Sequence, residues 1–94
     1  MIRVIIERTI AESMESNYEN TAMDLLQLAV RAEGFISGES LRDIHNPRHR
    51  ILLCKWRSAL DWDRWFASQE RKEAMGKLNL MLDGEEKITV LDLP

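Results

Sequence analysis

One segment constrains the fold of this chain more than any other, because residues 56–68 hold all three tryptophans and one of the two phenylalanines. The segment follows an apolar run that predicts a β-strand. Ser58 is suited to cap a helix, because its hydroxyl accepts hydrogen bonds from backbone N–H groups two or three residues later. In that helix Trp62, Trp65 and Phe66 share one face. This face predicts either the centre of a core or the wall of a pocket.

The rest of the pattern predicts further strands and one more helix. Apolar residues recur at spacings of three and four over residues 18–32, which indicates an amphipathic helix that Gly34 ends. Ser16 is expected to form a capping box with Glu19 at its start, and Ser13 is an alternative cap one turn earlier. The tryptophan-bearing helix continues or restarts at Ser68, and Gly76 is its expected end. The expected strands are residues 2–8, 35–43, 50–57 and 87–93, and the expected helices are residues 16–32 and 59–75.

The order strand, helix, strand, strand, helix, strand predicts an α+β fold of the ferredoxin-like βαββαβ type, with an antiparallel sheet and both helices on one face. Residues 1–94 are expected to form a single domain. The second face of such a sheet is usually polar, yet Ile5 lies there between Arg3 and Glu7. Two short helices cannot cover both faces. We therefore expect this face to pack against a second copy of the chain, which gives a homodimer.

Charge and composition exclude several classes of function. A net charge of −3 leaves no basic stripe for nucleic acid. No apolar stretch reaches the ~20 residues of a membrane span. The N-terminal residues lack the features of a signal peptide, so we expect a cytoplasmic protein that binds neither membranes nor nucleic acid. The single cysteine, Cys54, is expected to be a small buried hydrophobe, and no cluster with metal-ligand spacing occurs, so no metal is expected.

A cationic cluster lies beside the turn that Asn46 and Pro47 are expected to form. Two interpretations of this cluster remain open: it is a solvated hairpin end, or it is a patch that binds an anion. Its members are Arg42, Arg48, Arg50, His45 and His49.

Two diffuse motifs carry a resemblance to a known family. They are Trp56, Ser58, Trp65, Phe66 and Ser68 around the tryptophan-bearing helix, and Gly34-Phe35 at the entry to the second strand. In these motifs the sequence resembles the antibiotic biosynthesis monooxygenase domain, which belongs to the dimeric α/β-barrel superfamily. That family includes cofactor-free oxygenases of anthrone-type polyketides, quinol monooxygenases, haem-degrading enzymes and proteins with no established activity. The motifs are specific for the fold and weak for the reaction.

The resemblance implies a pocket between the sheet and the tryptophan-bearing helix. Haem-degrading relatives use an Asn late in the first strand, a Trp in the helix and a His near that helix's end. Trp65 matches the Trp, whereas Glu7 and Met75 stand at the other two positions. Haem degradation is therefore disfavoured, and we expect no cofactor.

Within this pocket we expect two catalytic residues. Glu7 would take a proton from a phenol or enol, and Trp65 would stack on a flat substrate. The expected substrate-binding residues are Arg3, Trp62, Phe66 and Met75. Each has a plainer interpretation, because Arg3 and Glu7 are spaced to form an ion pair and the other side chains are spaced to form a core.

Two functions remain open. The first is a cofactor-free monooxygenase acting on a flat aromatic or quinol-like small molecule, with oxygen uptake that Glu7→Gln or Trp65→Ala abolishes. The second is a non-catalytic homodimer that binds a small hydrophobic molecule, or only forms a stable assembly. A structure bears on the choice by showing whether Glu7 and Trp65 share a cavity.

Overall fold

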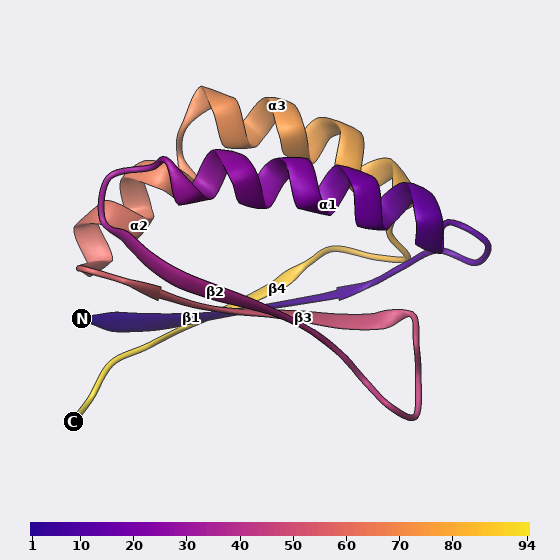
Figure 1. The fold of residues 1–94 in the computed structure, drawn as a ribbon, viewed down its shortest axis with the longest axis horizontal. Helices are drawn as coiled ribbons and strands as arrows, with labels where there is room; N and C mark the ends of the chain where they lie inside the picture. The colour runs from indigo at the N-terminus through magenta and orange to yellow at the C-terminus, as the bar shows by residue number, and fades with distance from the viewer.

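A computed structural model describes residues 1–94 as one antiparallel sheet with every helix on the same side (Figure 1). The strands are β1 (Ile2–Thr9), β2 (Phe35–Arg42), β3 (His49–Trp56) and β4 (Lys87–Leu91), in the sheet order β2-β3-β1-β4. The helices are α1 (Glu15–Val30), α2 (Ala59–Phe66) and α3 (Gln69–Leu78), followed by the 3-10 turn η1 (Asn79–Met81). The ferredoxin-like α+β class is confirmed, with the second helix divided in two.

Strand β1 divides the core from an open face. Its even-numbered residues from Ile2 to Arg8 are buried, and its odd-numbered residues from Arg3 to Thr9 are half-buried. Because side chains alternate along a strand, the even set faces the helices and the odd set faces away. The helices leave that second face uncovered in one chain (Figure 1), as the mixed polarity of the strands predicts.

The tryptophans form the centre of the core. Trp56, at the end of β3, is 1% exposed, and its ring centroid lies 6.4 Å from that of Trp65 in a stacked arrangement. Trp62 meets the same ring edge-on at 5.7 Å. Such aromatic pairs contribute about 0.5–1.5 kcal/mol each beyond the area they bury. Phe66 is 45% exposed, so the aromatic face of this segment is mainly core.

The start and end of α1 differ from the sequence prediction. The helix begins at Glu15 without a side-chain cap, so the capping role predicted for Ser16 or Ser13 is wrong. Ser16 already lies inside the first turn, and Ser13 takes a left-handed φ of 68° in the preceding loop. At the other end α1 stops at Val30, before Gly34 is reached. Gly34 does adopt the left-handed conformation, with φ of 88°, but in the loop before β2.

The tryptophan-bearing segment forms two capped helices. Ser58 caps α2 as predicted, because its Oγ accepts a hydrogen bond from the Asp61 N–H at 3.2 Å. Ser68 caps α3 in the same way, accepting from the Arg71 N–H at 3.2 Å. Gly76 does not end α3 as predicted, because the helix continues to Leu78. A Cβ added at Gly76 would meet only open space.

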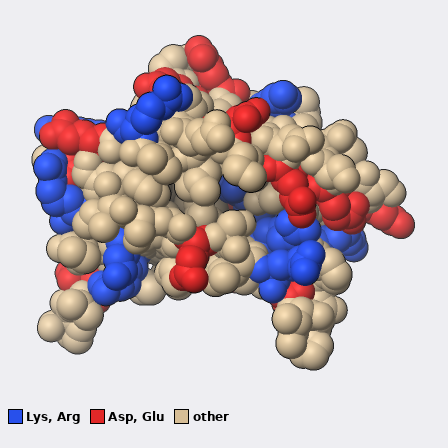
Figure 2. All heavy atoms as spheres, in the orientation of Figure 1, with Lys and Arg blue, Asp and Glu red and all other residues tan.

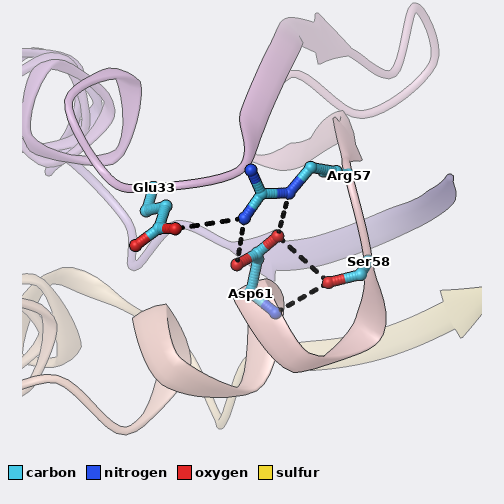
Figure 3. A network of polar contacts seen from close by, with 4 residues as sticks. All are labelled: Glu33, Arg57, Ser58 and Asp61. Atoms are coloured by element: carbon cyan, nitrogen blue, oxygen red, sulfur yellow. Dashed lines mark hydrogen bonds and ion pairs between the residues drawn. The ribbon is translucent and has the colours of Figure 1, made fainter.

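A polar clamp joins the end of β3 to α2 and to the loop before β2 (Figure 3). The buried Asp61 carboxylate accepts hydrogen bonds from Arg57 Nε at 2.8 Å and Ser58 Oγ at 3.0 Å. Arg57 also donates its backbone N–H to the Gly34 carbonyl at 2.7 Å and reaches Glu33 with Nη2 at 3.2 Å. The Arg57 hydrogen bond, with help from Ser58, holds the pKa of Asp61 below its ordinary 3.8. The two motifs that carry the family resemblance are thus one structural unit.

Gly34→Ala is expected to lower the free energy of unfolding by at least about 2 kcal/mol. A Cβ at this position would overlap the Asp61 side chain, and the left-handed φ adds a cost of about 1–2 kcal/mol for an L-residue. The matched control is Gly76→Ala, which adds a Cβ in open space inside α3 and should stabilise by about 0.5–1 kcal/mol. Urea unfolding of the wild type and the two variants measures both changes in the free energy of unfolding. Equal changes in the two variants would contradict the close packing of Gly34 against Asp61.

Candidate functional site

A cavity of about 210 Å³ opens between α1 and the sheet, at the end where β2 and β3 form their hairpin. An engineered protein cavity of about 150 Å³ holds benzene, so this space accommodates a substituted aromatic ring. Side chains of α1 form one wall and side chains of β1, β2 and β3 form the other. The lining residues are Arg8, Tyr18, Glu19, Ala22, Met23, Leu26, Ser40, Arg50, Ile51 and Leu52.

A second, much smaller space of about 20 Å³ lies deeper between the helices and the sheet. It shares Arg8, Ala22, Leu26 and Leu52 with the larger cavity and is lined further in by Trp65. Trp65 therefore lies behind the cavity, at its inner end.

Arg8 is the charged group at the base of this cavity. It is 5% exposed and projects from β1 toward the helices, where Nε donates to Glu86 Oε2 at 2.9 Å. Its Nη1 donates to the Tyr18 hydroxyl at 3.2 Å, and Nη2 lies 4.0 Å from the sulfur of Met75. Burying a guanidinium is costly unless it is paired, and here one carboxylate and one hydroxyl fix its orientation.

Glu86 holds a second buried arginine. Arg71 of α3 donates from Nη2 to Glu86 Oε1 at 2.6 Å and is 5% exposed. Its guanidinium also lies 4.9 Å from the Phe66 ring centroid and 5.9 Å from that of Trp62, in cation–π geometry. One carboxylate thus serves two arginines, so the Arg8, Arg71 and Glu86 cluster keeps one net positive charge.

The structure does not bring the six predicted site residues together. Arg3 and Glu7 belong to the odd-numbered set of β1 and lie on the open face. The other four lie on the helix side of the sheet: Trp62, Trp65, Phe66 and Met75. The sheet itself separates the two groups, so the expected pocket shared by Glu7 and Trp65 is not formed within one chain.

On the open face Glu7 faces the hairpin instead. Its Oε1 lies 3.4 Å from Nε2 of His49, whose Nδ1 lies 3.0 Å from Oδ2 of Asp43. The hydrogen bond to Asp43, more than that to Glu7, raises the pKa of His49 above its ordinary 6.5. The same hydrogen bond lowers the pKa of Asp43 below 3.8.

Sequence reasoning missed Arg8, Tyr18 and Arg50 as lining residues. The signal for Arg8 was present in the period-two pattern, since Arg8 falls on the same strand face as Val4 and Ile6. Arg50 is the residue opposite Arg8 in β3, but that register depends on the hairpin and is not visible in the sequence.

Other groups offer little chemistry. Cys54 is 3% exposed, and burial raises the pKa of its thiol above the ordinary 9.0. No group of three or more His, Cys, Asp and Glu side chains is arranged to hold a metal ion. None of the helices combines the length and apolar character of a membrane-spanning segment.

The order βαββααβ and the sheet order, with the helices on one side of the sheet, define a ferredoxin-like α+β protein. The model of the family "antibiotic biosynthesis monooxygenase" matches residues 1–77. This chain belongs to that family, and the resemblance seen in its sequence is confirmed.

Solved structures agree on the fold. A conserved protein from Methanosarcina mazei Go1 is 24% identical, with a TM-score of 0.87 over 95% of this chain and 88% of its own. An antibiotic biosynthesis monooxygenase is 14% identical, with a TM-score of 0.89 over 100% and 99%. SnoaB, a cofactor-independent oxygenase from Streptomyces nogalater, is 12% identical, with a TM-score of 0.88 over 98% and 91%. A search among curated proteins gave no match.

Proposed function

We propose that this chain is a cofactor-independent monooxygenase that oxidises a flat, ionisable aromatic or quinol-like molecule in the cavity between α1 and the sheet. The observation that carries the proposal is the buried Arg8 guanidinium at the base of a cavity whose walls are otherwise largely apolar. The family supports the reaction class, since the structurally similar SnoaB is described as a cofactor-independent oxygenase.

Oxidation without a cofactor requires the substrate itself to give electrons to dioxygen, and an anion does this more readily than a neutral phenol or enol. The N–H groups of Arg8 favour that anion, because a fixed cation away from water stabilises charge on oxygen. In this proposal Glu19, the one carboxylate in the lining, accepts the proton. A substrate CH₂ group then gains one oxygen atom as a carbonyl, and the other oxygen atom leaves as water with both hydrogens.

Trp65 and Glu7 have different places in this proposal. Trp65 lines the small space next to the cavity, together with Arg8 and Leu52. A role of Glu7 as the base stays a prediction that requires substrate on the open face. The variant Glu7→Gln distinguishes a reaction on the open face from one in the cavity on the helix side. If the reaction occurs in the cavity, this variant should leave oxygen uptake unchanged.

The proposal is tested by oxygen uptake with anthrone and with a panel of quinols. We expect turnover above buffer in the wild type, and about a 100-fold loss in Arg8→Gln. Under anaerobic conditions the wild type, but not Arg8→Gln, should show the absorbance of the bound anthrone anion. Arg64→Gln removes an exposed arginine from α2 and is the matched control.

Two results would contradict the proposal. Absence of oxygen uptake with the whole panel would remove the enzyme assignment. A folded Arg8→Gln protein, judged by circular dichroism, that turns over at the wild-type rate would remove the assigned site.

One observation favours a second candidate function, a non-catalytic binder of a small hydrophobic molecule. No histidine lines the cavity, and both histidines lie at the hairpin end of β2 and β3. Binding of anthrone without ionisation or oxygen uptake would select this alternative.

We also propose that the chain forms a homodimer through the open face of its sheet. This face carries half-buried apolar residues among charged ones, and no element of the same chain covers it (Figure 1). A cytoplasmic location remains a prediction from the sequence.

A further inference from the structure

Three arginines form a row across the sheet on its helix side. Arg50 of β3 is the direct partner of Arg8 in β1 and of Arg42 in β2. Residues directly opposite each other share one face of a sheet, and Arg8 and Arg50 both reach side chains of α1. Figure 2 shows Lys and Arg atoms gathered at the lower right, under the acidic atoms of the upper layer. Like charges placed directly opposite are destabilising unless counter-charge is supplied.

The protein supplies less counter-charge than the row requires. Glu86 is shared between Arg8 and Arg71, and Glu19 is the single ion-pair partner of Arg50. The Glu19 side chain is 58% exposed, whereas that of Arg50 is 11% exposed. No ion pair to Arg42 is formed. The four arginines Arg8, Arg42, Arg50 and Arg71 thus meet two carboxylates, so positive charge is in excess beside the cavity.

Arg50 also keeps unused donors. A guanidinium has five N–H groups. In Arg50 one donates to the Pro47 carbonyl at 2.7 Å and one to Glu19 Oε1 at 2.9 Å, which leaves three. Arg50 lines the cavity together with Ala22, Leu26 and Leu52, so a planar guanidinium cation lies next to an apolar wall.

We infer that the cavity selects an aromatic carboxylate, with the ring against the apolar residues of α1 and the carboxylate on the free N–H groups of Arg50. A guanidinium binds a carboxylate through two parallel hydrogen bonds, and the excess of positive charge beside the cavity favours an anionic ligand. Arg42, next in the row and exposed at the sheet edge, attracts the anion to the cavity from solution. This inference rests on the proposed use of the cavity and names the substrate class for it.

The test compares two ligands that differ only by the carboxylate, 1-hydroxy-2-naphthoate and 1-naphthol. Their affinities are measured by tryptophan fluorescence or calorimetry, without oxygen, at low and high salt. We expect the wild type to prefer the naphthoate at least tenfold and to lose part of that preference in high salt. Arg50→Gln should lower the preference at least tenfold, while the control Arg64→Gln should keep it.

The outcomes separate this inference from the proposed function. Equal affinity for both ligands in the wild type, or an unchanged preference in folded Arg50→Gln, overturns the carboxylate site even if oxygen uptake occurs. A preference that depends on Arg50, without oxygen uptake for any substrate, supports the site and rejects the oxygenase.

Discussion

Glu86→Gln is expected to lower the free energy of unfolding by about 3–5 kcal/mol, because it leaves two buried guanidinium groups without their shared carboxylate. The side chains of Arg8 and Arg71 are only 4% and 6% exposed, so water cannot replace the lost partner. The loss is a large fraction of the total stability of a domain, which is about 5–15 kcal/mol. Urea unfolding followed by circular dichroism measures it.

Glu33→Gln is the matched control for this change. Glu33 also pairs with an arginine, Arg57, but the two side chains are 72% and 60% exposed. An ion pair in solvent contributes about 0–1 kcal/mol, so this variant should be nearly as stable as the wild type. Similar small losses in both variants would show that Glu86 does not compensate buried charge.

A further variant separates the unpaired charge from lost packing. Arg8→Met, Arg71→Met and Glu86→Leu together remove the whole cluster and leave apolar side chains of similar length. Replacing a buried ion cluster in this way is often neutral or stabilising. The triple variant should therefore be more stable than Glu86→Gln alone.

Leu53→Arg is expected to convert a dimer into a monomer. Leu53 lies on the open face of β3, opposite Ile5 in β1 and Glu39 in β2, so its replacement puts a charge in the middle of the proposed interface. Light scattering after size exclusion should give twice the chain mass of 11.0 kDa for the wild type and 11.0 kDa for the variant.

Leu80→Arg is the control for the dimer. It places the same charge on η1, which is outside the sheet, at a side chain that is already 81% exposed. This variant should keep the wild-type mass. A wild type that is monomeric at micromolar concentration would contradict the argument from the uncovered sheet face.

Local patterns predicted most of the fold. Alternation in residues 2–8 and the spacing of three and four in α1 are properties of neighbouring residues, and both elements form where expected within a few residues. The caps at Ser58 and Ser68 are equally local, because each hydroxyl binds an N–H three residues later. The expected cap at Ser16 is wrong because α1 already begins at Glu15, which puts Ser16 inside the first turn.

The site was predicted less well, because it depends on which strand face meets the helices. Placing Glu7 beside Trp65 required the odd-numbered face of β1 to point inward, and the even-numbered face does so. A shift of one residue along a strand moves every side chain to the other face of the sheet. Arg8, one residue further on, is the charged side chain of β1 that lines the same small space as Trp65.

The sequence by itself determined the order of the strands and helices, the family and the helix cap at Ser58, since these depend on residues close together in the chain. The tertiary structure decided which charges meet. Glu86 binds Arg8 across 78 positions of sequence, and Arg50 lies opposite Arg8 only because of the register of β1 with β3. Long-range pairing of this kind is set by packing and strand register, which no local pattern encodes.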